Sequence, residues 1–267
     1  MQHRSIGYRL WKHLNKKYGG GNDVSVTENI ISGGGATYTC RGYQITGNNN
    51  RIIVVENGIE RELGQNERID GLNINITGNY NIVKINLPIV SHNSMLQISN
   101  DNCYFEAGPS NDLKFFVCMD YSRGQKCIIG KNTTMVDVFI WLTEGSSCFI
   151  GDDCMFSKHI EIWGADGHAI LDQNSKEVLN LPKHPVVIGN HCWIGAFAHF
   201  HKGAFLRDNS IVGEGSIVTR TFDRENVVIA GNPAKIVKEN ITWSRFSGWG
   251  LKEYPWIHDE IKNGEHL

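Results

Sequence analysis

The 267-residue sequence has little proline, almost no net charge and no long apolar run. Its 6 prolines stand beside 29 glycines, a balance typical of a chain that turns often without being disordered. The net charge of -2 gives no indication of a nucleic-acid-binding surface. No uncharged apolar run approaches the roughly 18 residues of a membrane span, and residues 1–10 hold no signal-peptide core. We therefore expect a cytoplasmic protein with no membrane segment and no nucleic-acid partner.

The cysteines do not form the pattern of a disulfide framework. They number 7, which is odd, and no two of them are spaced as C-x-x-C. We expect buried, reduced thiols and no bound metal.

From Ile188 onward, apolar residues recur at every sixth position. A helix does not produce this pattern, because six residues rotate by about 240° at 3.6 residues per turn. A single long strand is excluded by the interspersed glycines. Short strands separated by bends fit, with a large residue pointing inward in each strand and a small one at each corner; three such segments close one coil of a solenoid. The large positions are Ile188, Ile194, Phe200, Leu206, Val212 and Val218, and the corner positions are Cys192, Ala198, Ala204, Ser210, Ser216 and Phe222.

Weaker copies of the repeat precede this stretch. Residues 45–50 (ITGNNN) parallel residues 76–81 (ITGNYN), and glycine and asparagine suit the corners of looser coils. Ile162 and Ile188 are 26 residues apart, which is not a multiple of six, so a loop leaves the coil between them. The other inward positions that we expect are Ile150, Phe156 and Ile162, and, in a less regular series, Ile129, Met135 and Trp141.

Residues 188–195 (IGNHCWIG), 211–220 (IVGEGSIVTR) and 230–235 (AGNPAK) resemble the hexapeptide-repeat acyltransferases, in their sugar and polysaccharide O-acetyltransferase branch. The resemblance implies an all-β fold, a left-handed parallel β-helix. It implies an enzyme that moves an acetyl group from acetyl-CoA to a hydroxyl of a sugar or of a cell-surface polysaccharide, such as capsule or lipopolysaccharide. It also implies a homotrimer with each site at a subunit boundary.

The sequence predicts four segments. Residues 1–22 form a short helical or linker segment, and 23–127 form irregular solenoid coils. Residues 128–235 form the regular hexapeptide β-helix, with the catalytic loop at 163–187. Residues 236–267 form a C-terminal cap.

The predicted loop carries the candidate catalytic residues. Transfer to a hydroxyl needs a general base that works near neutral pH, which suits histidine. The family's base is a histidine on the loop before the I-G-x-x-x-W-I-G motif, so the resemblance implies that His168 is the base. Asp166 is expected to orient the imidazole or to contact the acceptor, although a main-chain carbonyl is an alternative orienting group. His184 and His191 are weaker candidates for substrate contacts.

Members of the family bind CoA in a groove between neighbouring solenoids. The resemblance implies which positions of this sequence line that groove. Trp193 is expected to border the groove, and Ala196 lets the backbone approach the thioester. Glu214 stands where the family usually has alanine, so its backbone should make the contact. The remaining candidates, of which the cations would bind the CoA phosphates, are Thr219, Arg220, Lys235 and Lys238.

Three alternatives remain at this point. One is N-acetylation of an amino sugar. Another is a zinc enzyme on the same scaffold, such as a γ-type carbonic anhydrase, which needs an H-x-x-x-x-H pair that this sequence lacks. The third is a non-catalytic β-solenoid binding module, which would have no need of the histidine loop.

Overall fold

The computed structural model describes residues 38–40, 43–64 and 67–253. The described chain is built mainly from parallel strands, with antiparallel pairs at the ends of the sheets and one short helix, α2 (Gly248–Glu253). The predicted segment 1–22 and the end of the predicted cap lie outside the described residues. No described helix is long and apolar enough to cross a membrane.

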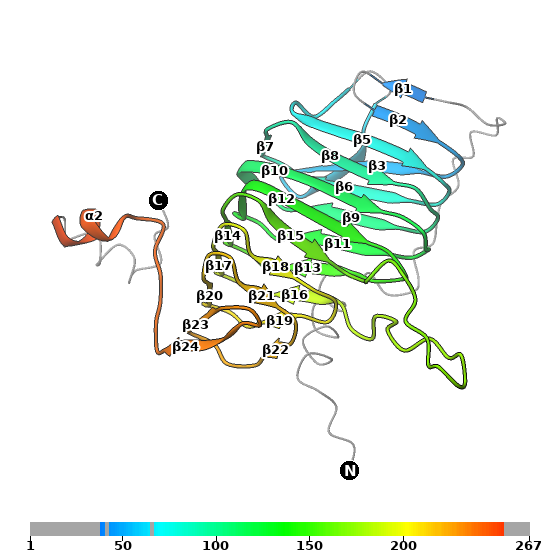
Figure 1. Ribbon diagram of the computed structural model, residues 1–267. Helices are drawn as coiled ribbons and strands as arrows, with labels where there is room; N and C mark the ends of the chain where they lie inside the picture. The colour runs from blue at the N-terminus through cyan, green and yellow to red at the C-terminus, as the bar shows by residue number, and fades with distance from the viewer. Residues whose placement is uncertain (1–37, 41–42, 65–66, 254–267) are drawn as a thin grey trace, which may run out of the picture.

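The strands wind into a parallel β-helix with three faces (Figure 1). Each regular coil places one short strand on each face, and every strand pairs in parallel with the strand of the next coil. The first face holds β14 (Met155–Phe156), β17 (Trp193–Ile194), β20 (Ile211–Val212) and β23 (Val227–Ala230), to which β24 (Lys235–Glu239) pairs antiparallel. The second face holds β15 (Ile160–Trp163), β18 (His199–Phe200) and β21 (Ile217–Val218). The third face holds β13 (Cys148–Ile150), β16 (Val186–Ile188), β19 (Phe205–Leu206) and β22 (Thr221–Phe222).

The earlier coils continue the same faces with longer strands. The strands β10 (Ser110–Met119) and β12 (Thr134–Leu142) bend around a corner and so belong to both the first and the second face. The others are β1 (Tyr38–Cys40), β2 (Tyr43–Thr46), β3 (Arg51–Glu56), β4 (Ile59–Glu62), β5 (Leu72–Thr77), β6 (Ile82–Asn86), β7 (Ile89–Ser91), β8 (Ser94–Ile98), β9 (Tyr104–Ala107) and β11 (Lys126–Ile129). Residues 45–46 pair with residues 76–77, which confirms that the two ITGN segments stack as equivalent corners.

The six-residue repeat predicted the core correctly. All six large positions from Ile188 to Val218 are fully buried, and so are the small corner residues. One position was wrong: Trp141 points outward, while Ile140 and Leu142 are buried. Ile140 stacks on Ile162 and Met135 on Phe156, so this coil uses five residues where the next uses six. A one-residue slip inverts every side chain that follows it in a strand.

Two corners of the prism contact segments that leave the regular coils. The corner between the second and third faces, here the loop corner, releases residues 164–185, which project at the lower right of Figure 1. The corner between the third and first faces is called the strap corner. It is contacted by residues 240–253, which are called the strap. After β24 the strap runs back along the side of the stack towards α2 instead of closing the end of the last coil (Figure 1).

Candidate active site

The base of the loop is fastened by a network around Asn180. This buried side chain donates to the Asp166 carboxylate at 2.7 Å and to the main-chain oxygen of His168 at 2.9 Å, and its oxygen accepts from the Ile170 amide at 2.7 Å. Lys202, from the next coil, donates to the Asp166 carboxylate and to the Asn180 carbonyl oxygen. The two ends of the loop are thus fastened to each other and to the solenoid.

The charge of the Asp166 carboxylate, at the base of the loop, is set by its hydrogen bonds. Partial burial alone would raise the pKa of Asp166, but the hydrogen bonds from Lys202 and Asn180 outweigh it and hold that pKa below its ordinary value. The carboxylate is therefore ionised at neutral pH, and the ion pair with Lys202 persists there. The base of the loop is therefore held at neutral pH by a clamp of two opposite charges.

His168 lies on the exposed side of this clamp. Its side chain is solvent-exposed, and within the described residues its ring has no recorded hydrogen bond. Asp166 contacts Asn180 and Lys202 instead, so its expected roles of orienting the imidazole and touching the acceptor stay predictions. The Asn180 bond to the His168 carbonyl fixes the backbone at this residue. An imidazole that is anchored only through its backbone remains free to meet a substrate.

The residue before His168 has to be glycine. Gly167 has a φ of +78°, and a Cβ there would lie 2.6 Å from the indole of Trp141 on the second face. That indole is itself held by a hydrogen bond from its Nε1 to Asp120, 2.9 Å long. The turn that presents His168 therefore rests directly on the solenoid wall.

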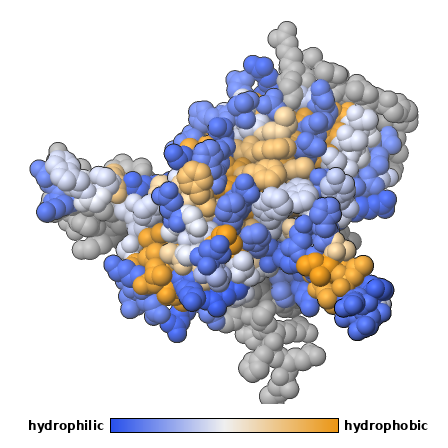
Figure 2. Space-filling view, in the orientation of Figure 1, coloured by the Kyte–Doolittle hydropathy of each residue, from blue (hydrophilic) through white to orange (hydrophobic). Residues whose placement is uncertain are grey.

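A pocket opens between the returning arm of the loop and the loop corner. Its apolar wall includes Leu179 and Leu181, both more than half exposed, and its basic wall includes Lys183, His184 and Lys202. Figure 2 shows the exposed apolar residues of the loop as an orange patch at the lower right, beside hydrophilic groups. His184, a weaker sequence candidate for substrate contact, thus lines a pocket with a positive wall.

The predicted CoA residues divide into separate parts of the solenoid. Trp193 is on β17 of the first face, and Lys235 and Lys238 are on β24 at the edge of the same face. Thr219 and Arg220 lie at the loop corner, exposed, with the guanidinium of Arg220 5.2 Å from the Phe222 ring.

Ala196 and Glu214 lie at the third corner, between the first and second faces. The Ala196 carbonyl accepts from the Gly215 amide at 2.9 Å, so the two turns are stacked. The loop with His168 leaves β15 on the second face, whereas Trp193 is on the first. Within one chain, His168 and the Trp193 side of the predicted cofactor site belong to different faces, and the roles of these residues stay predictions.

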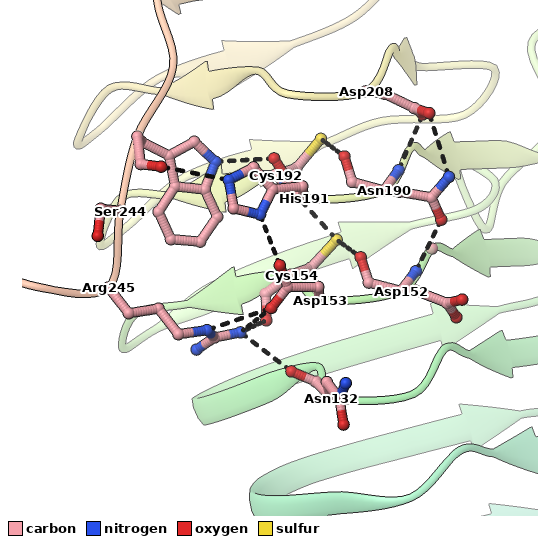
Figure 3. Close-up of polar contacts among 12 residues, drawn as sticks. Asn132, Asp152, Asp153, Cys154, Asn190, His191, Cys192, Asp208, Ser244 and Arg245 are labelled. Atoms are coloured by element: carbon pink, nitrogen blue, oxygen red, sulfur yellow. Dashed lines mark hydrogen bonds and ion pairs between the residues drawn. The ribbon is translucent and has the colours of Figure 1, made fainter. Parts of the chain in front are cut away.

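The sequence did not reveal a second polar cluster, at the strap corner (Figure 3). His191 Nδ1 lies 2.6 Å from Asp153, and its ring stacks on Trp243 with centroids 4.3 Å apart. Arg245 bonds to Asp153, to Thr134 and to the carbonyl oxygens of Asn132 and Cys154. The hydrogen bond that the His191 ring donates to Asp153 raises the pKa of His191. His191, a weak sequence candidate for substrate contact, holds the strap, and its contact with a substrate stays a prediction.

The local sequence indicates where the left-handed corner lies, but it does not indicate which distant residue will contact that corner. Residues 132, 153, 191, 209 and 226 all occupy the left-handed region at this corner, where asparagine and aspartate are favoured. Histidine is also enriched in this region, but the partner of His191, residue 243, lies 52 residues further along the chain. Only the fold brings them together.

The cysteines from Cys103 to Cys192 are free and buried, as expected. Burial and the neighbouring Cys154 raise the pKa of the Cys192 thiol well above its usual value, so it is not a nucleophile at neutral pH. Among the described residues no group of three His, Cys, Asp or Glu side chains is placed to hold a metal ion.

Comparison with known proteins assigns the family. The family model for bacterial transferase hexapeptide (six repeats) matches residues 185–220. A polysialic acid O-acetyltransferase of Neisseria meningitidis is 37% identical over 174 residues, which cover 64% of this chain and 79% of that protein. The chain belongs to the hexapeptide-repeat acetyltransferases.

Other members of the hexapeptide-repeat acetyltransferases match shorter stretches. A polysialic acid O-acetyltransferase of Escherichia coli O1:K1 is 35% identical over 124 residues, which cover 46% of this chain and 40% of that protein. A galactoside O-acetyltransferase of Escherichia coli K12 is 29% identical over 119 residues, covering 45% of this chain and 57% of that protein. This chain thus spans about half the length of these two relatives.

The solved structure of the polySia-specific acetyltransferase NeuO has the same fold. The TM-score is 0.65 at 24% identity, and the match covers 82% of this chain and 99% of that chain. This confirms the predicted all-β fold, a left-handed parallel β-helix.

Proposed function

We propose that this hexapeptide-repeat acetyltransferase moves an acetyl group from acetyl-CoA to a hydroxyl of a surface polysaccharide, with His168 as general base. The observation that most directly supports this role of His168 is its exposed imidazole, on a loop whose base is clamped by Asp166, Asn180 and Lys202. A base must be both accessible to the hydroxyl and held in place, and this arrangement supports both needs.

The chemistry is a direct transfer. His168 accepts the proton of the acceptor hydroxyl as the oxygen attacks the thioester carbonyl carbon. The negative charge that develops on the thioester oxygen is met by a backbone N–H. Collapse breaks the carbon–sulfur bond and releases CoA thiolate, which takes up a proton. The buried cysteines, with Cys192 held as a thiol, support a path without an acyl-enzyme.

The placement of the predicted residues supports a site shared between subunits. His168 leaves from the loop corner, whereas Trp193, Lys235 and Lys238 are on the first face. In a ring with cyclic symmetry, the loop corner of one subunit faces a different surface of its neighbour, so both halves can line one cleft. We infer a homotrimer with three such clefts, each holding acetyl-CoA.

The acceptor that we favour is an anionic glycan such as polysialic acid. Two relatives carry polysialic acid in their names. The pocket beside the loop has Lys183, His184 and Lys202 on one wall and leucines on the other, which suits a sugar with a carboxylate. Acetyl-CoA and sugar polymers under synthesis are both found in the cytoplasm, where we place the enzyme.

The experiment is a thiol-release assay with purified protein. Acetyl-CoA is supplied with polysialic acid, with a neutral glucan or with no acceptor. We expect release of CoA thiol that depends on polysialic acid, and a product bearing O-acetyl groups by mass spectrometry. A binding scaffold would give no thiol release with any glycan and no thermal stabilisation by CoA, and that result would refute the proposal.

A further inference from the structure

The strap is fastened along the strap corner by successive contacts. The Ile241 amide donates to the Asn226 carbonyl at 3.0 Å, and Trp243 Nε1 donates to the His191 carbonyl at 2.7 Å. Arg245 then reaches Asp153 and Asn132. Each contact falls one or two coils further from the C-terminal end of the solenoid, so residues 241–245 of the strap are held against this corner.

Trp243 occupies the centre of this attachment. It is 7% exposed, although it lies on a surface segment. One side of its indole stacks on His191 at an interplanar angle of 13°. The Arg245 guanidinium lies 5.8 Å from its ring centroid. A large aromatic ring held by a stack and a hydrogen bond has little freedom to turn.

The same ring touches the residue that the proposed function places at the cofactor. The ring centroids of Trp243 and Trp193 are 6.2 Å apart at 46°, within the range of favourable aromatic pairs. Trp193 is 39% exposed and belongs to a strand of only two residues. Its neighbours along the first face are the half-buried Met155 and Ile211. A side chain this exposed would otherwise choose among several rotamers.

We propose that Trp243 is a positioning residue for Trp193. The cluster of His191, Asp153 and Arg245 fixes the strap, and the strap holds the Trp193 indole in one orientation against the first face. Acetyl-CoA then meets a wall that is already ordered, so binding does not have to restrict the indole. This inference rests on the proposed function, because it needs Trp193 to border the acetyl-CoA site.

The consequence is a change in cofactor binding rather than in chemistry. Trp243→Ala should raise the KM for acetyl-CoA about tenfold and leave kcat within about twofold, because it removes binding shared by ground and transition states. Trp243→Phe keeps a ring beside Trp193 and should restore most of the KM. Trp249→Ala, at an exposed tryptophan further along the strap, is the matched control and should leave KM unchanged.

The test measures these variants at a temperature well below their melting points, together with Trp193→Ala. Arg245→Ala is a second route to a loosened strap, should Trp243→Ala fold poorly, and should raise KM in the same direction. If Trp193→Ala raises KM but Trp243→Ala and Arg245→Ala do not, the positioning role is refuted while the proposed function stands. If Trp193→Ala itself leaves KM unchanged, Trp193 does not border the cofactor, and this inference falls with that placement.

Discussion

The loop corner and the strap corner solve the same problem in opposite ways. Each binds a segment that leaves the solenoid, and each uses an ion pair between that segment and a coil: Asp166 of the loop with Lys202, and Arg245 of the strap with Asp153. The loop is clamped only at its base, which leaves His168 exposed. The strap is bound through residues 241–245, at the centre of which Trp243 is buried. A segment that must meet a substrate keeps its tip free, and a segment that supports a wall is fixed where it lies against that wall.

The largest effect on activity is expected from substitution of His168, on the exposed part of the loop. His168→Ala should lower kcat by about 10²–10⁴, because it removes the general base. The melting temperature should hardly change, since the side chain is exposed. His92→Ala, at another exposed histidine far from the loop, is the control in the same thiol-release assay. Unchanged turnover in His168→Ala would remove this residue from the mechanism.

Mixed trimers test whether the two corners work across a subunit boundary. His168→Ala and Trp193→Ala chains are unfolded together and refolded, and activity is measured at acetyl-CoA concentrations far below KM, where each variant alone has low activity. If every site takes His168 from one chain and Trp193 from its neighbour, about a quarter of the sites regain both residues, so activity should rise to about a quarter of the wild-type value. Activity that stays at the level of the separate variants would show that both residues serve the same chain's site.

A smaller effect is expected at the base of the loop. Lys202→Ala removes the donor to Asp166 and to the Asn180 carbonyl, so the loop should lose its fixed angle. We expect kcat/KM to fall about tenfold, because small displacements of a catalytic group are costly. Lys158→Ala, an exposed lysine at another corner, is the control. A wild-type kcat/KM in Lys202→Ala would mean that the clamp does not set the position of His168.

The smallest effect is a pH dependence of stability at the strap corner. The pKa of His191 is raised by Asp153, so its contribution is complete below about pH 6.5 and is lost as pH rises through the folded-state value. Burial would raise the pKa of Asp153, but His191 and Arg245 lower it, so its contribution is present above about pH 4 and lost as pH falls further. His191→Asn, which suits the left-handed corner, should lower the melting temperature by about 2–4 °C near pH 6.

That difference should shrink towards pH 9, where His191 is neutral in the wild type as well. Differential scanning fluorimetry across the pH range measures it. His159→Asn makes the same exchange at another left-handed corner that does not touch the strap. Equal pH profiles for His191→Asn and the wild type would show that the pair with Asp153 does not stabilise the fold.

Different parts of the molecule were predictable to different degrees. The regular coils were predicted residue by residue, because inward positions recur strictly and each coil contacts only its neighbours. The error at Trp141 arose where one coil is a residue shorter, which local periodicity does not mark. The loop was found because it breaks the period. The network around Asn180 was not, since its partners come from residues 166, 168, 170 and 202.

The sequence by itself determined the solenoid, its core and the place where a loop leaves it, because these depend on spacings of six residues along the chain. The tertiary structure decided what lies at each corner: that Lys202 closes the loop, that His191 stacks on Trp243, and that His168 and Trp193 occupy different faces. Such contacts join residues tens of positions apart. Stacked coils bring them within hydrogen-bonding distance, and no local pattern encodes which side chains will meet there.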